Sequence, residues 1–156
     1  MSVRLLATVL ACGFLLASAD RAMAEDKPAK DAVTKINEQF DAALSRRDIS
    51  ALDAAWAHDD SVTAIHPSSK AVVTGWDAVR KSWQGAFDAF PELSVTLKDA
   101  SVRVVGNLAS VVGVETIRGR RPNGETAEFA ALTTNIYELR NGSWLMVHHQ
   151  ASRSPQ

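Results

Sequence analysis

The chain has 156 residues with 17 basic and 18 acidic side chains, giving a net charge of −1. No basic stripe suggests nucleic acid, and the length suits one domain with a packed core. Its one cysteine, Cys12, excludes a disulfide framework within the chain.

Residues 1–24 have the pattern of a secretory signal peptide. Arg4 precedes an apolar run from Leu5 to Ala19, and Ala22-Met23-Ala24 is the small-x-small pattern of a cleavage site. The run is too short to span a bilayer. We therefore expect a mature protein that begins at Glu25, is secreted or periplasmic, and has no membrane attachment after cleavage. Because Cys12 would leave with the signal peptide, a cysteine nucleophile and a zinc–cysteine site are also excluded.

Residues 25–30 are charged around one proline and predict a flexible leader before a domain that spans residues 31–153. From Asp31, apolar residues recur at the spacing of one helical face: Val33, Ile36, Phe40 and Leu44. Ser50, with Asp53 three residues later, predicts the N-cap of a second, short helix.

A β-hairpin followed by a third helix is predicted next. Ser61 to Thr74 holds two short β-branched runs joined by a Pro-Ser-Ser turn, and the first run ends at His66-Pro67. Apolar residues then recur at helical spacing: Val79, Trp83, Phe87 and Phe90. Pro91 ends this helix.

The rest of the chain predicts four long antiparallel strands. Leu93, Val95 and Leu97 alternate, and Val102 and Val104 alternate on the other parity, so we expect a bulge near Lys98 to Ser101. Three dipeptides are turn signals between strands: Gly106-Asn107, Asn123-Gly124 and Asn141-Gly142. Helices followed by such a meander predict an α+β fold in which a curved sheet wraps the helices. The absence of βαβ alternation excludes a doubly wound parallel sheet.

Four sequence marks, in this order, carry a resemblance to a known superfamily. They are Ala-Leu-x-x-x-Asp in the 42–48 region, Trp-Ala-His-Asp-Asp-Ser-Val at 56–62, Gly-Trp-Asp-Ala-Val-Arg at 75–80, and Asn-Gly-Ser-Trp-Leu-Met-Val-His-His at 141–149. The chain resembles the cone-shaped, nuclear transport factor 2-like (NTF2-like) superfamily, which includes ketosteroid isomerase, the SnoaL-type polyketide cyclases and the association domain of calmodulin-dependent kinase II. It is most similar to the SnoaL-like subgroup.

The resemblance implies positions for catalytic residues. The catalytic carboxylate of the isomerase, which precedes a proline at the end of the first strand, is replaced here by His66. Its neutral, hydrogen-bond-donating acid corresponds to Asn135, and its oxyanion tyrosine would fall near Phe40. Because phenylalanine cannot donate and an amide is a weaker donor than an acid, these differences argue against steroid isomerisation itself.

Strand parity gives a second prediction of the pocket. On the last strand, even-numbered residues such as His148 and Gln150 share one face, and His149 points the other way. If the even face lines the concave side, His148 and Gln150 meet four residues of the neighbouring strands: Thr133, Asn135, Tyr137 and Glu115. Aromatic core residues could also serve as ligand-stacking walls: Trp56, Trp83 and Phe87.

These residues predict acid–base chemistry, isomerase-like or cyclase-like, on a small and largely apolar carbonyl compound. His66, with an ordinary pKa near 6.5, would be the general base, tuned by His148 or Glu115. Asn135 and Tyr137 would stabilise the oxyanion. No cofactor is expected. Because an unpaired buried carboxylate is costly, Glu115 should either face outwards or pair with a histidine.

Several alternatives remain open. The pocket could bind a small hydrophobic ligand without catalysis, and His66 could simply be a strand-end histidine bonded to a loop carbonyl. His66, His148 and Glu115 could form a two-histidine, one-carboxylate metal site. Arg118, Arg120 and Arg121 lie beside Pro-Asn-Gly, which indicates a solvated loop, with anion binding as the alternative.

The outer face of the sheet predicts a partner. A cone leaves this face uncovered, and an exposed apolar sheet usually contacts a second copy, so we expect a homodimer. The residues expected to supply this face are Val111, Leu145, Val147 and His149.

Overall fold

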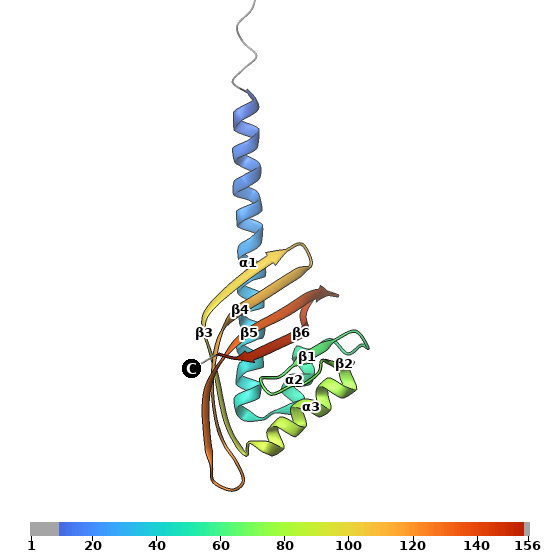
Figure 1. Ribbon diagram of the computed structural model, residues 1–156. Helices are drawn as coiled ribbons and strands as arrows, with labels where there is room; N and C mark the ends of the chain where they lie inside the picture. The colour runs from blue at the N-terminus through green and yellow to red at the C-terminus, as the bar shows by residue number, and fades with distance from the viewer. Residues whose placement is uncertain (1–9, 155–156) are drawn as a thin grey trace, which may run out of the picture.

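The computed structural model describes residues 10–154, which form three helices and one six-stranded sheet (Figure 1). The helices are α1 (Leu10–Arg46), α2 (Ile49–Ala55) and α3 (Trp76–Ala89). The strands are β1 (Thr63–Ile65), β2 (Val73–Thr74), β3 (Glu92–Val105), β4 (Leu108–Arg120), β5 (Thr126–Arg140) and β6 (Ser143–Arg153). This is the predicted α+β fold.

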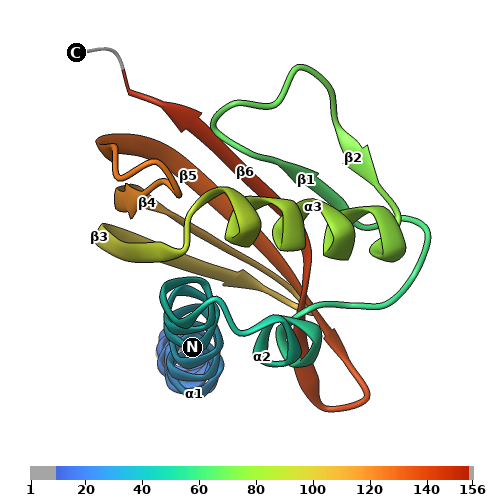
Figure 2. The ribbon, with the colours of Figure 1, turned by 90° about the horizontal axis from the view of Figure 1, so that it is seen from below.

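The sheet has the strand order β2-β1-β6-β5-β4-β3 and is antiparallel except where β1 pairs with β6. The three helices lie on the same, concave side of the curved sheet, with α3 crossing it near β1 and β6 (Figure 2). The parallel β1–β6 pairing was not predicted. It brings the loop after Ile65 next to the C-terminal half of β6.

Helix α1 buries the predicted apolar stripe but begins earlier than expected. Val33 and Phe40 are fully buried, and Leu44 is nearly so. The helix is continuous from Leu10 and includes residues 25–30, where the sequence predicted a flexible leader. Its glutamate, lysine and alanine residues favour a helix, although Pro28 does not. Cleavage before Glu25 stays a prediction, and residues 1–9 of the predicted signal peptide lie outside the described residues.

No helix within residues 10–154 combines the length and the hydropathy needed to cross a membrane.

The start of α2 corrects one prediction. The N-cap is Asp48, whose Oδ1 accepts a hydrogen bond from the Ala51 N–H at 3.0 Å, and Ser50 already lies inside the helix. Both residue types are good caps, so the choice depends on where the chain leaves α1. Arg47, at φ 55°, makes that turn, which places Asp48 at the first available position.

Turns and bulges within the meander agree with the sequence at most points. The register of β3 and β4 shifts between Lys98 and Ser101, as predicted. Asn141 and Gly142 have φ of 50° and 81°, which suits a two-residue hairpin turn. A second shift, in β5–β6 between Ile136 and Tyr137, was not predicted. There His148 pairs with Ile136 and Met146 with Tyr137, so one extra residue, Val147, lies in β6.

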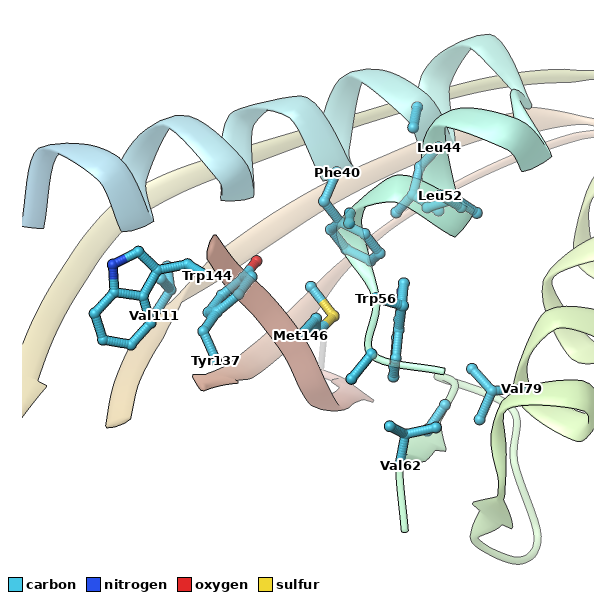
Figure 3. Packing of buried hydrophobic residues seen from close by; sticks show 14 of the residues in the cluster. Phe40, Leu44, Leu52, Trp56, Val62, Val79, Val111, Tyr137, Trp144 and Met146 are labelled. Carbon is cyan, nitrogen blue, oxygen red and sulfur yellow. The ribbon is translucent and has the colours of Figure 1, made fainter. Parts of the chain in front are cut away.

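The apolar core lies between the sheet and the helices (Figure 3). Phe40 of α1, Trp56 after α2, and Met146 of β6 are at most 1% exposed and meet at its centre. Tyr137 lies beneath α1 with its hydroxyl directed to the helix. This core fills the region under α1 and α2, so the remaining interior space lies under α3.

Candidate functional site

A cavity of about 260 Å³ lies between the C-terminal half of α3 and the concave face of the sheet. We call it the α3 cavity. Its polar or titratable lining includes Glu115, His66, His149 and Trp83. Two arginines, Arg121 and Arg153, also line it. The rest of the wall is mainly apolar or aromatic and includes Leu44, Phe87, Phe90, Val95, Ile117 and Phe129. Such a cavity, slightly below the volume of sites for drug-sized ligands, suits a compact and largely apolar molecule.

His66 follows β1 and is fixed by α3. The Ser82 hydroxyl donates to the Val79 carbonyl at 2.7 Å, so Ser82 accepts the 2.8 Å hydrogen bond from His66 Nε2. This leaves His66 Nδ1 without a hydrogen bond among the described residues. Burial lowers the pKa of His66 to about 4, below the ordinary value on which the sequence prediction relied. The imidazole is therefore neutral at physiological pH and can accept a proton at Nδ1.

His149 is the second histidine of the α3 cavity, 1% exposed. Its Nδ1 donates to Asn135 Oδ1 at 2.8 Å, which leaves Nε2 as the atom without a hydrogen bond in the described structure. Burial, and secondarily the charges that His66 and His148 would carry, lower the pKa of His149 to about 3. His149 is thus a neutral imidazole held in one tautomer.

Glu115 on β4 is 2% exposed and lines the same cavity. Its Oε1 has no hydrogen-bond partner in the described structure, and no histidine forms an ion pair with it. Burial raises the pKa of Glu115 to about 7, although the neighbouring Thr133 side chain opposes the shift. The sequence predicted either an outward-facing or a histidine-paired carboxylate. Neither arrangement occurs. The carboxyl group is buried without a histidine partner, and below pH 7 it is mainly a neutral carboxylic acid that can donate a proton.

The ring of Trp83 packs against both histidines of the cavity. Its ring centroid lies 4.4 Å from that of His66 and 5.1 Å from that of His149, and Phe40 packs behind it at 5.7 Å. Its buried Nε1 has no hydrogen-bond partner in the described structure. A buried donor without a partner is uncommon, and in a cavity wall it is available to a ligand. Phe87, one turn later on α3, also lines the cavity, so both residues lie where ligand stacking was predicted.

A second group of buried polar residues lies under α1, and we call it the α1 polar cluster: Asn37, Asp41, Asn135 and Tyr137. Asn37 Oδ1 accepts from Asn135 Nδ2 at 2.7 Å and from the Tyr137 hydroxyl at 2.9 Å. Asn37 Nδ2 donates to Asp41 Oδ2 at 3.2 Å. Burial and the nearby charges of Glu115 and Glu38 raise the pKa of Asp41 to about 8.

The α1 polar cluster changes the roles predicted for Asn135 and Tyr137. Both side chains are fully buried, their donors are used on Asn37, and neither lines the α3 cavity. They cannot contact an oxyanion there. Asn135 instead orients His149. Sequence analysis missed Asn37, although it lies four residues after Val33 and three before Phe40, on the buried face of α1.

His148 and Gln150 do not face the concave side, contrary to the parity prediction. The extra residue Val147 shifts the alternation, so that His149 pairs with Asn135 on the inner face and His148 pairs with Ile136 on the outer face. His148 Nδ1 is bonded to the Thr63 hydroxyl at 2.7 Å, and burial lowers its pKa. Gln150 pairs with Thr134 and is hydrogen-bonded to Ser152.

The remaining predicted ligand contacts lie in the core. Thr133 is buried beside Glu115 and does not line the α3 cavity. Trp56 packs against Trp76 at 5.9 Å and next to Met146, away from the cavity. Thr133 Oγ1 and Trp56 Nε1 have no hydrogen-bond partner in the described structure, but neither residue lines the α3 cavity.

The three-residue metal site considered as an alternative does not form, because His148 lies on the opposite face from His66 and Glu115. Within residues 10–154, no group of three His, Cys, Asp or Glu side chains could hold a metal ion.

A wider surface depression of about 500 Å³ lies at the free ends of β3, β4 and β5. Its charged side chains pair with each other: Arg118 with Glu128 at 2.9 Å and Arg120 with Glu92 at 3.6 Å. With its charges paired on the surface and no buried polar group in its lining, it is a weaker candidate than the α3 cavity.

Comparison with known proteins gives one family. Residues 33–155 match the family model of a SnoaL-like domain. A curated relative, the F-box protein SKIP8 of Arabidopsis thaliana, is 28% identical over 121 residues, which is 78% of this chain. The match spans 49% of that relative, about half its length.

Solved structures share the fold over most of the chain. An NTF2-like superfamily protein from Salmonella enterica serovar Typhimurium aligns with a TM-score of 0.78 at 17% identity, covering 84% of this chain and 94% of that one. A candidate dehydratase of the NTF2-like family from Streptomyces avermitilis gives 0.73 at 23% identity, with 81% and 96% covered. A candidate calcium/calmodulin-dependent kinase II association domain from Thiobacillus denitrificans gives 0.67 at 30% identity, with 77% and 93% covered.

Proposed function

Because the chain belongs to the SnoaL-like family, we propose that it binds a small, largely apolar carbonyl compound in the α3 cavity and catalyses proton transfer on it. One observation carries the proposal. A neutral imidazole and a neutral carboxylic acid, His66 and Glu115, line the same mainly apolar cavity. Titratable groups whose pKa values are moved by burial in a cavity are typical of acid–base sites.

The proposed reaction is an enolisation. His66 Nδ1 takes the proton from the carbon next to the carbonyl, the bonding electrons form the enol double bond, and Glu115 donates its proton to the carbonyl oxygen. Return of a proton to a different carbon would complete an isomerisation. His149, held by Asn135, is available to hydrogen-bond the ligand through Nε2. The candidate dehydratase among the structural neighbours is consistent with chemistry of this class.

The proposed roles set the pH dependence. His66 must be unprotonated and Glu115 protonated, so the rate should fall below about pH 4 and above about pH 7, following the two pKa values. This optimum is more acidic than that of a histidine with an ordinary pKa.

The test is deuterium exchange. A panel of small ketones and enones is incubated with the protein in deuterated buffer, and exchange at the carbon next to the carbonyl is followed by proton NMR. We expect His66→Gln to lose at least about 100-fold of the catalysed rate. His58→Gln is the matched control, because His58 stacks on Trp76 at 4.6 Å and does not line the cavity. Equal rates for His66→Gln and the wild type on a ketone that is exchanged would refute the role of His66.

Ligand binding without catalysis is the second candidate function. It is favoured by the pKa of His66, about 4, which makes the imidazole a weak base. Extracting the purified protein and identifying the bound compound by mass spectrometry separates the two functions. A lipid-like compound without a carbonyl group, together with no exchange on the ketone panel, would favour binding alone.

We also propose that the chain is exported and cleaved before Glu25. The apolar run and the Ala22-Met23-Ala24 pattern support this. Mass spectrometry of protein recovered from a bacterial periplasm or culture medium should find a mature chain that starts at Glu25. An intact N-terminus in the cytoplasm would contradict it.

A homodimer through the outer face of the sheet is proposed as well, with corrected residues. Val111 and His149 are buried on the inner face, so they cannot contribute. Val112 and Leu132 are 46% and 51% exposed, and Val114, the register partner of Leu132, lies beside them on the outer face. Sedimentation equilibrium should give a dimer for the wild type and a monomer for Leu132→Lys; a monomeric wild type would exclude the dimer.

A further inference from the structure

We propose that the ligand of the α3 cavity is a compact apolar carboxylic acid whose carboxylate is bound at the cavity mouth by Arg121 and Arg153. This inference rests on the proposed function, because it names the class of molecule that the same cavity would take. It starts from the two arginines that line the cavity, one in the turn after β4 and one at the end of β6.

Both guanidinium groups are held against aromatic side chains of the cavity wall. Arg121 lies over the ring of Phe90, 4.9 Å from its centroid, and Arg153 lies over the ring of Phe129 at 4.0 Å. Both phenylalanines also line the α3 cavity. A guanidinium that lies over an aromatic face can still donate hydrogen bonds through its N–H groups, which lie in its own plane. It has also lost part of its rotamer freedom before any ligand binds. The stacking thus prepares two cations at the entrance of an apolar space.

Neither of these arginines has a carboxylate partner within residues 10–154. Their neighbours on β4 differ: Arg118 pairs with Glu128, and Arg120 pairs with Glu92. The unpaired positive charge of this end of the sheet is therefore concentrated at the cavity mouth. An arginine fork matches a carboxylate in geometry, with two parallel hydrogen bonds.

Charge also sets the orientation of the ligand. The interior offers apolar walls and neutral groups, so an ionised carboxylate would lose its hydration there without gaining a cation. At the mouth it meets two guanidinium groups. The apolar body would then extend inwards to Trp83, and the reacting carbonyl would be a second group of the molecule, near His66 and Glu115.

The experiment compares matched probes by isothermal titration calorimetry at pH 6 and low salt. The probes are 3-phenylpropanoate, its uncharged analogue 3-phenylpropanamide, and acetate as the charged group alone. We expect the wild type to bind the carboxylate at least about tenfold more tightly than the amide, because charge-assisted hydrogen bonds exceed neutral ones in strength. The preference should shrink at 0.5 M NaCl, since the arginines are exposed.

Two double variants locate the carboxylate. Arg121→Gln with Arg153→Gln should reduce the preference to within about twofold, with most of the loss in the affinity for the carboxylate. Arg118→Gln with Arg120→Gln removes the same number of charges from the end of β4, outside the α3 cavity, and should keep the preference. All four arginines are exposed, so folding should be unaffected. Equal loss in both double variants would mean that only the general field attracts the anion, and it would overturn the proposal.

The outcome also separates this inference from the proposed function. Ala86→Trp fills the cavity from α3, and Gly85→Trp places the same side chain on the exposed side of that helix. If the wild type binds amide and carboxylate equally, and Ala86→Trp alone abolishes both, the cavity remains a binding site and the carboxylate proposal fails. If neither aromatic probe binds, or acetate binds as tightly as 3-phenylpropanoate, the carboxylate proposal fails as well. An exchange reaction on neutral ketones would still stand in either case.

Discussion

The concave face of one sheet carries two groups of buried polar residues that differ in what they bond. In the α1 polar cluster, the Asn135 and Tyr137 donors meet on Asn37, and that asparagine donates to Asp41 Oδ2. The other oxygen, Asp41 Oδ1, has no partner in the described structure, but Asp41 does not line the α3 cavity. In the α3 cavity, Trp83 Nε1 and Glu115 Oε1 have no partner in the described structure. Side chains that satisfy one another fix a core, whereas unpartnered groups beside a cavity are available to a ligand. Position on the sheet therefore matters less for function than whether a group is already bonded.

The largest expected effect tests whether the α1 polar cluster is structural. Asn37→Ala removes the acceptor of two buried donors, so we expect a loss of about 2–4 kcal/mol in the free energy of unfolding. Urea denaturation measures it. Tyr137→Phe, which removes one donor and creates no unpaired one, should cost about 1 kcal/mol. A loss for Asn37→Ala no larger than that for Tyr137→Phe would contradict the assignment.

A pH-dependent effect at Asp41 comes next in size. Its folded pKa is raised from 3.8 to about 8, so its contribution to stability is fully present below pH 4 and is lost as pH rises to 8. Asp41→Asn keeps an acceptor for Asn37 and removes this loss. Its stability relative to the wild type should therefore increase by about 2 kcal/mol between pH 5 and pH 8, a value discounted for partial exposure. Thermal or urea unfolding at both pH values checks this, and a constant difference would refute the shifted pKa.

Glu115 in the α3 cavity should make a smaller contribution to the pH dependence of the free energy of unfolding. The folded pKa of Glu115 is raised from 4.5 to about 7, so stability is lost as pH rises through this interval. Glu115→Gln should gain about 1 kcal/mol on the wild type between pH 5 and pH 8. In the exchange assay it should also remove the fall in rate above pH 7. A decline above pH 7 that persists in Glu115→Gln would assign that limb to another group.

The smallest effect concerns the shape of the α3 cavity. A Cβ at Gly119 would lie 2.5 Å from Phe90 Cδ1, so Gly119→Ala must displace the ring that carries Arg121. We expect 3-phenylpropanoate to bind about two- to fivefold more weakly, with little change in stability. Gly85→Ala is the matched control, because nothing lies within 4 Å of its added Cβ. Unchanged affinity in Gly119→Ala would show that Phe90 does not shape the ligand site.

The sequence predicted features that depend on local chemistry. The parity change between Leu97 and Val102 predicted a bulge, Asn141-Gly142 predicted a two-residue turn, and the Val79, Trp83 and Phe87 spacing predicted α3 and its buried face. Each of these signals lies within a few residues of the element that it specifies.

The errors came from long-range geometry. Nothing in Trp144 to Ser152 marks Val147 as an extra residue, because both parities of β6 carry a histidine and apolar residues. Because of this one extra residue, His149 faces the α3 cavity, where the sequence predicted His148. Similarly, the spacing of Arg121 and Arg153 in sequence gives no indication that both line one cavity. The place of His66 in the cavity lining could be predicted, because a strand end next to a helix is a local feature.

The unbroken course of α1 has a consequence for maturation. Pro28 lies in the interior of this 37-residue helix, where proline removes a backbone hydrogen bond and is costly. Signal-peptide cleavage before Glu25 would move Pro28 into the first turn, where a missing N–H costs nothing. The processed helix would then begin a few residues before its proline. Cleavage would therefore remove the loss of helix stability that Pro28 causes in the precursor.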